Sequence, residues 1–409
     1  MKFAHLADVH IGAWRDPRMK ELAIEAFEKT ILEIIDLKVF FVLIAGDLFN
    51  TSIPPLDQVK RAVSSLKKLK QNNIPVYAIA GSHDYSASGK TMLDILEEAD
   101  LLTLVTKGFV DENNKLHLKF TIDPKTKIKI TGILGRKGSL DKHYYEDLAR
   151  EELEKKELEN EKKIFMFHTA LNELKPKELE KMDANPASIM PKGFDYYAGG
   201  HVHIVDDCTL PGYKKIVYPG PLFPASFSEL EKLSSGSYCL VDYDDFSVDR
   251  KKLVVKESLS LKIDSEKKTA EKINLELLEL IDNNDFKDKI VLLRISGKLV
   301  EGRISDIRLK DFSEKAYSKG AYFIMRNTNQ LLTPEFEEVF VQGTEGQVED
   351  KLIEEHLGQF PINDLSKEEE KVLTKELLSL LGESQNDGEK KYEYDDRVKI
   401  NAKSLLDKN

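Results

Sequence analysis

The sequence contains few cysteines and no long apolar run. Its two cysteines, Cys208 and Cys239, cannot build a disulfide framework, and CxxC zinc spacing is absent. The longest purely apolar stretch, Val39 to Ala45, is far shorter than the roughly 20 residues that span a bilayer. Asp8 and His10 arrive before an N-terminal signal sequence could form its apolar core. We therefore expect a cytoplasmic protein without membrane contact.

The chain also lacks an excess of positive charge. Its 61 basic and 72 acidic side chains give a net charge of −11, which excludes binding to nucleic acid by bulk electrostatics alone. Any contact with DNA or RNA must use local cationic patches or bound metal ions. The 41% hydrophobic content is too high for a disordered chain. A length of 409 residues predicts two or three domains, one of them with a sizeable core.

Strand and helix patterns alternate in the first third of the chain. Apolar periodicity predicts helices at 19–35, 56–69 and 91–98, and apolar runs predict strands at 2–7, 40–45 and 75–80. This alternation predicts a layered α/β core with parallel strand pairs. Further along, the sequence predicts buried strands at 164–167 and 196–199, edge strands at 217–220 and 236–242, and a charged helix at 145–162.

The pattern changes twice in the second half. We expect a first domain over 1–258, a small α+β domain over 259–334, and a linker with C-terminal helices over 335–409. In the last part, Ser366-Lys367-Glu368-Glu369 forms a capping box before an apolar stripe that ends at Gly382. An apolar helix in a polar region is either a docking element or a helix that packs on its own domain.

Metal-binding side chains follow five of the strand candidates. These are Asp8 and His10, Asp47, His83 in Gly81-Ser82-His83-Asp84, His168, and His201 with His203. Each motif alone is ordinary, because Gly-Asp is usually a turn and a single histidine after a strand is usually solvated. Ligands collect at the carboxyl ends of strands in α/β sheets. Their repetition in the same context therefore predicts one metal site.

The donor types narrow down the metal and the substrate. Carboxylate and imidazole without thiolate favour manganese, iron or zinc, and a mixed oxygen and nitrogen site that keeps water suits manganese best. Two divalent ions carry four positive charges, whereas Asp8 and Asp47 supply two negative ones. The site would stay cationic, which fits a phosphate ester. Two ions about 3.5–4 Å apart activate a hydroxide and stabilise the phosphoryl oxygens together.

The motifs DxH, GD, GxH[D/E], H and GHxH, in this order, resemble those of the calcineurin-like metallophosphoesterases. HLADVHIG, IAGDLFN and the later domains are most similar to the DNA double-strand-break repair nucleases of the meiotic-recombination-eleven and SbcD family. The resemblance is strong over 1–225 and weaker beyond. It implies a β-sandwich flanked by helices, a small capping domain and a C-terminal helical tail.

The resemblance also implies roles for single residues. It implies a first manganese ion bound by Asp8, His10, Asp47 and His203, and a second bound by Asp47, Ser82, His168 and His201. His83 resembles the catalytic histidine that protonates the leaving sugar oxygen, and Asp84 would orient it.

Two positions depart from the family pattern. Most members carry asparagine where this chain has Ser82, and a serine hydroxyl is a shorter and weaker ligand. Some active members carry histidine where this chain has Asn50. We expect activity that is retained but more dependent on metal concentration.

The resemblance implies a manganese-dependent nuclease that acts on DNA ends together with a coiled-coil ABC-type ATPase of the Rad-fifty (SbcC) kind. It also implies a homodimer. Near the first motif, Arg15, Arg18 and Lys20 either meet DNA phosphates or form a solvated helix start. Two other functions stay open: a phosphoesterase of the same fold acting on a small ester, and a scaffold on DNA ends whose catalysis is weakened at Ser82.

Overall fold

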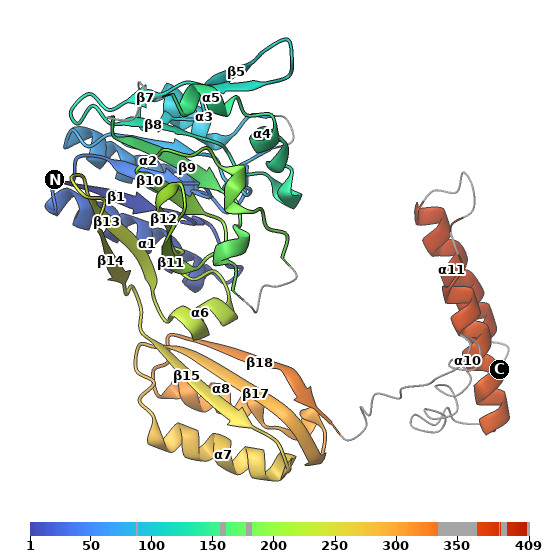
Figure 1. Ribbon diagram of the computed structural model, residues 1–409. Helices are drawn as coiled ribbons and strands as arrows, with labels where there is room; N and C mark the ends of the chain where they lie inside the picture. Colours follow the sequence, from blue (N-terminus) through green and yellow to red (C-terminus); the bar gives the residue numbers. More distant parts are fainter. Residues whose placement is uncertain are drawn as a thin grey trace. The chain divides into compact units, whose positions relative to one another are not determined.

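The computed structural model describes residues 1–86, 89–155, 161–176, 182–333, 366–383, 385 and 391–406. The chain divides into two compact units, Met1–Pro334 and Glu335–Asn409, whose elements are drawn in Figure 1. Among the described residues, no helix is long and apolar enough to cross a membrane.

Two six-stranded sheets form the centre of the first unit (Figure 1). The first has the order β14 (Val248–Leu253), β13 (Gly236–Asp242), β1 (Lys2–Leu6), β2 (Val42–Ala45), β3 (Val76–Ile79) and β4 (Thr103–Leu104). The second has the order β11 (Val205–Leu210), β12 (Tyr213–Pro219), β10 (Tyr196–Gly200), β9 (Lys163–His168), β8 (Lys129–Gly132) and β7 (Thr121–Ile122). Strands β1 to β4 run parallel, as do β8, β9, β10 and β12. The carboxyl ends of these parallel strands therefore meet at one edge of each sheet.

The two sheets pack face to face because their central strands are apolar on both sides. In β2, Leu43 packs between the sheets, whereas Ile44 packs under the helices on the outer face. Phe3 of β1 stacks on Phe41 with ring centroids 4.8 Å apart. It also meets Tyr196 of the second sheet edge to face at 5.4 Å. These aromatic contacts join the two sheets at their centre.

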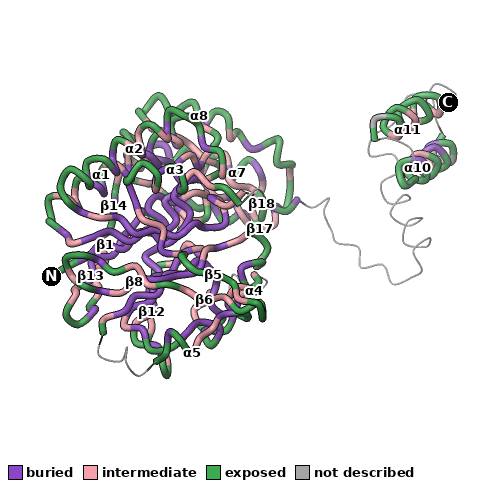
Figure 2. The backbone as a smooth tube through the Cα atoms, turned by 90° about the horizontal axis from the view of Figure 1, so that it is seen from above, coloured by how far each residue is buried: buried purple, intermediate pink, exposed green. Residues whose placement is uncertain are grey.

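Helices cover both outer faces. The helices on the first sheet are α1 (Pro17–Asp36), α2 (Leu56–Gln71) and α3 (Met92–Glu98), and those on the second are α4 (Lys142–Glu146) and α5 (Arg150–Leu153). Short 3₁₀ turns at Lys137–Ser139, Asn172–Leu174 and Ala187–Ile189 and a hairpin of β5 (Gly108–Val110) and β6 (Leu116–Leu118) complete this part. Figure 2 shows the buried strands enclosed by helices whose outer sides are exposed. The layers confirm the predicted α/β sandwich.

The predicted charged helix over 145–162 is wrong. Helix α4 ends at Glu146 and α5 begins at Arg150. Between them, Leu148 is buried and forms an isolated β-bridge with Leu116. The backbone N–H of Leu116 donates to the carbonyl of Asp147 at 2.8 Å. A tertiary backbone contact therefore interrupts the local helical preference; residues 156–160 lie outside the described residues.

The predicted edge strands at 217–220 and 236–242 are interior strands. Strand β12 lies between β11 and β10, and β13 lies between β14 and β1. The edge strands next to them, β11 and β14, are rich in charged residues and therefore gave no apolar signal.

Residues Ser258–Leu332 form a smaller assembly, here termed the β15–β18 module. It consists of β15 (Ser258–Asp264), β16 (Lys268–Thr269), α7 (Ala270–Asn283), β17 (Ile290–Glu301), a 3₁₀ turn (Ile304–Asp306), α8 (Leu309–Ser318) and β18 (Phe323–Leu332). Strand β17 pairs in parallel with the other three strands. Its Leu293 packs with Ile273 and Phe312 inside the module, whereas Ile290 and Leu292 join the helix-covered core of the sandwich. The module is thus anchored to the sandwich by apolar contacts.

In the second unit, residues 335–365 lie outside the described residues. Its described helices are α10 (Lys367–Leu381) and α11 (Lys391–Leu406). The capping box is present, because Ser366 and Glu369 each bond the other's backbone N–H. Leu373 and Leu380 are buried, whereas Leu381 is 59% exposed. Helix α10 therefore keeps part of its apolar stripe uncovered within this unit.

The contact between the sheets can be tested at Phe3. Its side chain is fully buried, so Phe3→Ala should lower the free energy of unfolding by about 3–5 kcal/mol. Phe109→Ala is the matched control, because Phe109 is 52% exposed and should cost less than about 1 kcal/mol. Urea unfolding of both variants measures the difference, and equal losses would contradict the packing described.

Candidate metal centre

The strand ends bring the predicted side chains together. Asp8 and His10 follow β1, Asp47 follows β2, and Ser82, His83 and Asp84 follow β3; His168 ends β9, and His201 and His203 follow β10. The donors form three groups, and within each group the ligand atoms lie within 4.8 Å of one another. The groups are Asp8 with His10 and His203, Asp8 with Asp47 and His168, and His10 with Asp47 and His83. The ring of His201 lies 5.1 Å from that of His168, between centroids. Ser82 is buried in the turn after β3.

The backbone is unusual at this edge. Asp8, His10, Asp47 and His203 have φ angles of 49°, 48°, 52° and 54°, and His201 has a φ of 102°. Such angles are uncommon outside glycine. Residues held in this region cluster where the surrounding structure fixes side chains for function. The strained turns aim the five side chains inward from the strand ends.

Carbonyl and carboxylate oxygens fix two of the imidazoles. The Nδ1 of His168 lies 2.9 Å from the carbonyl oxygen of Ala45, and the Nδ1 of His203 lies 3.1 Å from Oε2 of Glu229. An oxygen at this distance accepts the Nδ1 proton, so in the neutral form of each ring the lone pair lies on Nε2. Both rings therefore present a metal-binding nitrogen to the centre.

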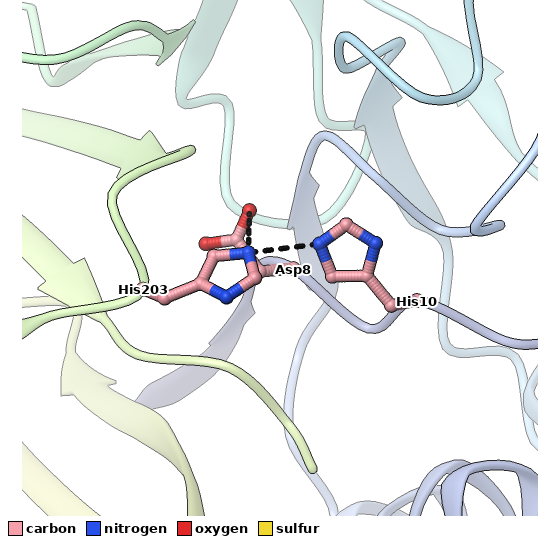
Figure 3. A group of neighbouring side chains, drawn as sticks. All are labelled: Asp8, His10 and His203. Atoms are coloured by element: carbon pink, nitrogen blue, oxygen red, sulfur yellow. Dashed lines mark hydrogen bonds and ion pairs between the residues drawn. The ribbon is translucent and has the colours of Figure 1, made fainter. Parts of the chain in front are cut away.

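The two Nε2 atoms face other donor atoms of the centre. The Nε2 of His168 lies 3.2 Å from Oδ2 of Asp47 and has no hydrogen-bond partner. The Nε2 of His203 lies 2.9 Å from Nε2 of His10 and 3.9 Å from Oδ1 of Asp8 (Figure 3). Ring nitrogens and carboxylate oxygens buried this close repel unless protons or metal cations lie among them. The residues present therefore fit divalent cations.

Burial and charge set the protonation of the histidines. Burial lowers the pKa of His10 to about 3 and that of His201 to about 3, so both stay neutral, the form that binds a metal. Burial also acts on His203, but Asp8 and Glu229 outweigh it and raise its pKa to about 9. A metal ion at His203 must therefore displace a proton.

Glycines leave room for the ring of His168. A Cβ at Gly46 would lie 2.1 Å from its Nδ1, one at Gly135 would lie 2.5 Å from its Cδ2, and one at Gly200 would lie 2.9 Å from its Nδ1. Three segments far apart in the sequence thus approach this imidazole so closely that no side chain fits between them.

Backbone amides hold the carboxylates. The N–H of His201 donates to both oxygens of Asp8 at 2.9 and 3.1 Å, and the N–H of His83 donates to Oδ1 of Asp47 at 2.7 Å. These bonds fix each carboxylate while leaving lone pairs for a metal.

Asp84 and His83 have separate partners. The carboxylate of Asp84 accepts the N–H groups of Leu48, Phe49 and Gly81 at 2.9–3.1 Å, so it ties the turn after β3 to the turn after β2. The Nδ1 of His83 lies 2.9 Å from the carbonyl oxygen of Asn50. The ring of His83 is therefore oriented by the backbone carbonyl of Asn50. From the sequence, we expected Asp84 to orient it.

Sequence reasoning missed Glu229. It lies on α6 (Phe227–Leu233), where its backbone N–H donates to the hydroxyl of the N-cap residue Ser226 at 3.2 Å. The Ser-x-x-Glu spacing signals a helix start. Nothing in that spacing signals a contact with a histidine 26 residues away.

Comparison with known proteins identifies the family of the chain. The model of the calcineurin-like phosphoesterase family matches residues 1–205, half of the chain, and the chain belongs to this family. Its fold and donor set are those of a metal-dependent phosphoesterase.

Relatives place the chain more narrowly. The DNA double-strand break repair protein Mre11 of Methanocaldococcus jannaschii is 30% identical over 312 residues, which cover 71% of this chain and 70% of that protein. The chain is thus also a member of the Mre11 family. The Mre11 proteins of Archaeoglobus fulgidus and Methanococcus maripaludis are 29% and 33% identical, over 57% and 50% of this chain. These two alignments cover 52% of each relative, about half its length.

Metal affinity should depend on pH. Asp47 and Asp8 outweigh burial and raise the pKa of His168 to about 10, so His168 and His203 are both protonated near neutral pH without metal. Mn²⁺ must displace these protons, so its affinity should rise as the pH increases from 6.5 towards about 9. Calorimetry in buffers of different ionisation enthalpy measures the released protons. An Mn²⁺ affinity that does not change over this pH range would contradict the assignment.

Ser82 can be tested by restoring the longer side chain. Ser82→Asn should tighten binding of one Mn²⁺, because an amide oxygen reaches further and donates better than a hydroxyl. Ser64→Asn, at an exposed position of α2, is the control and should leave binding unchanged. Titration of both variants gives the two affinities; equal values for Ser82→Asn and wild type would refute a ligand at position 82.

Proposed function

We propose that this chain is a manganese-dependent DNA nuclease that acts on DNA ends in double-strand-break repair. The relatives that match most of its length are double-strand break repair proteins. The observation that carries the proposal is the clustering of carboxylate and imidazole donors, whose ligand atoms lie within 4.8 Å of one another in each group. Oxygen and nitrogen donors without thiolate suit manganese, and two ions would leave a net positive centre for a phosphodiester.

The donors would divide between two Mn²⁺ ions. Asp8, His10 and His203 would hold one, His168 with His201 and Ser82 would hold the other, and Asp47 would bridge them. The ions would supply an activated hydroxide and would neutralise charge on the phosphoryl oxygens.

His83 would protonate the leaving sugar oxygen. Its Nδ1 is engaged with the Asn50 carbonyl, which leaves Nε2 free to carry a proton to the substrate. The backbone N–H of His83 also donates to Asp47, so the acid is held beside a metal ligand.

The β15–β18 module would act as the capping domain predicted for 259–334. Arg18 of α1 contacts this module. Its guanidinium lies 4.7 Å from the ring centroid of Phe323 and donates to the carbonyl of Tyr322 at 3.2 Å. One of the cations suggested for phosphate contact is thus engaged with the module.

The proposal includes two protein partners. The uncovered apolar residues of α10, among them Val372 and Leu381, would dock on the coiled coil of an ABC-type ATPase of the Rad-fifty (SbcC) kind. A second copy of the chain would pack on helices of the sandwich, where Leu56 is 82% and Ile95 is 60% exposed.

One assay tests the function and the role of His83. With Mn²⁺, the protein should cleave end-labelled duplex DNA, and His83→Ala should lower the rate by about 10²–10⁴ while still binding both ions. His143→Ala, whose side chain is 74% exposed, is the control and should cleave normally.

Three results would contradict the proposal. Hydrolysis of p-nitrophenyl esters without DNA cleavage would indicate a small-molecule phosphoesterase. Inertness towards DNA and esters would indicate a scaffold. Loss of one ion in His83→Ala would make His83 a ligand instead of an acid.

A further inference from the structure

Helix α6 connects the metal centre with the β15–β18 module. Figure 1 shows α6 at the end of the sandwich that faces the module. On one side, Oε2 of Glu229 lies 3.1 Å from Nδ1 of His203. The same oxygen accepts the N–H of Ala225 at 2.9 Å, and Oε1 accepts the hydroxyl of Ser226 at 3.0 Å. The carboxylate that orients His203 is therefore fixed to the helix start.

The other side of α6 is clamped by the module. Arg294 of β17 donates from Nε to both oxygens of Glu231 at 2.9 and 3.0 Å, and from Nη2 to Oε2 at 2.8 Å. Its guanidinium lies 5.0 Å from the ring centroid of Phe227. The side chains of Arg294 and Glu231 are 17% and 13% exposed. A forked pair with little solvent is stronger and more directional than an ordinary surface pair.

Glu229 and Glu231 are expected to move together, because α6 is short and is held in place between the metal centre and the module. Residues two apart on a helix point to different sides, so Glu229 can reach the metal centre while Glu231 reaches the module. Leu230 between them is buried in the core of the sandwich. A shift of the module that pulls on Glu231 must therefore rotate or translate Glu229 with it.

We infer that α6 links the position of the β15–β18 module to the position of His203, with Glu229 and Arg294 as positioning residues. The inference rests on the two-ion centre proposed above. The link acts on one ion only, because His168 is oriented by the carbonyl of Ala45 within the sandwich. Movement of the module on DNA would thus adjust the affinity for the ion at His203.

Calorimetric titration of the full chain with Mn²⁺ tests the link. Arg294→Gln and Glu231→Gln should each weaken one of the two ions several-fold and leave the other unchanged. Arg61→Gln is the matched control: Arg61 forms a similar forked pair with Glu28 at 2.8 and 2.7 Å, between α2 and α1. It should change neither affinity.

A variant of Glu229 tests whether Arg294 acts on the metal ion through this residue. Glu229→Ala should weaken the same ion about 10–100-fold, as loss of an outer partner of a metal ligand does. If Arg294 acts through Glu229, the double variant should bind that ion no more weakly than Glu229→Ala alone.

The outcomes separate the two proposals. A wild-type chain that binds no Mn²⁺ would overturn the proposed function and the link together. Two bound ions in wild type with unchanged affinities in Arg294→Gln and Glu231→Gln would overturn the link alone. Equal weakening of both ions would also overturn it, because a general loss of structure has that effect.

Discussion

Mutual repulsion among buried electron pairs is the constraint on which this structure depends. The carboxylates of Asp8 and Asp47 are nearly inaccessible to solvent, and the Nε2 atoms of His168 and His203 point at them or at another imidazole. Removing such groups from water is unfavourable unless opposite charge accompanies them. Protons on His168 and His203 compensate in part. Divalent cations would compensate fully, and their chemistry suits phosphate esters.

The fold supplies the rigidity that this crowding requires. Parallel strands in two sheets end at one edge, and apolar side chains on both faces of β2 hold those sheets together. The close approach of loops at Gly46 and Gly135 fixes the ring of His168 without intervening side chains. Left-handed turns at Asp8 and Asp47 then direct the carboxylates inward. Packing of the core thus maintains strained turns at the centre.

Much of this could be predicted from the sequence, because the chemistry is repeated in one local context. Each ligand motif directly follows an apolar strand, so strand ends and donors could be identified together. The misses have a common cause. Leu148 leaves its predicted helix to pair with Leu116, and Glu229 reaches His203 across the fold. Such roles depend on tertiary neighbours, which no local spacing encodes.

Anomalous diffraction at the manganese absorption edge tests the central claim most directly. Crystals of the chain grown with Mn²⁺ should give two anomalous peaks about 3.5–4 Å apart, lying among Asp8, Asp47, His168 and His203. A single peak, or peaks bound to other residues, would contradict the two-ion centre.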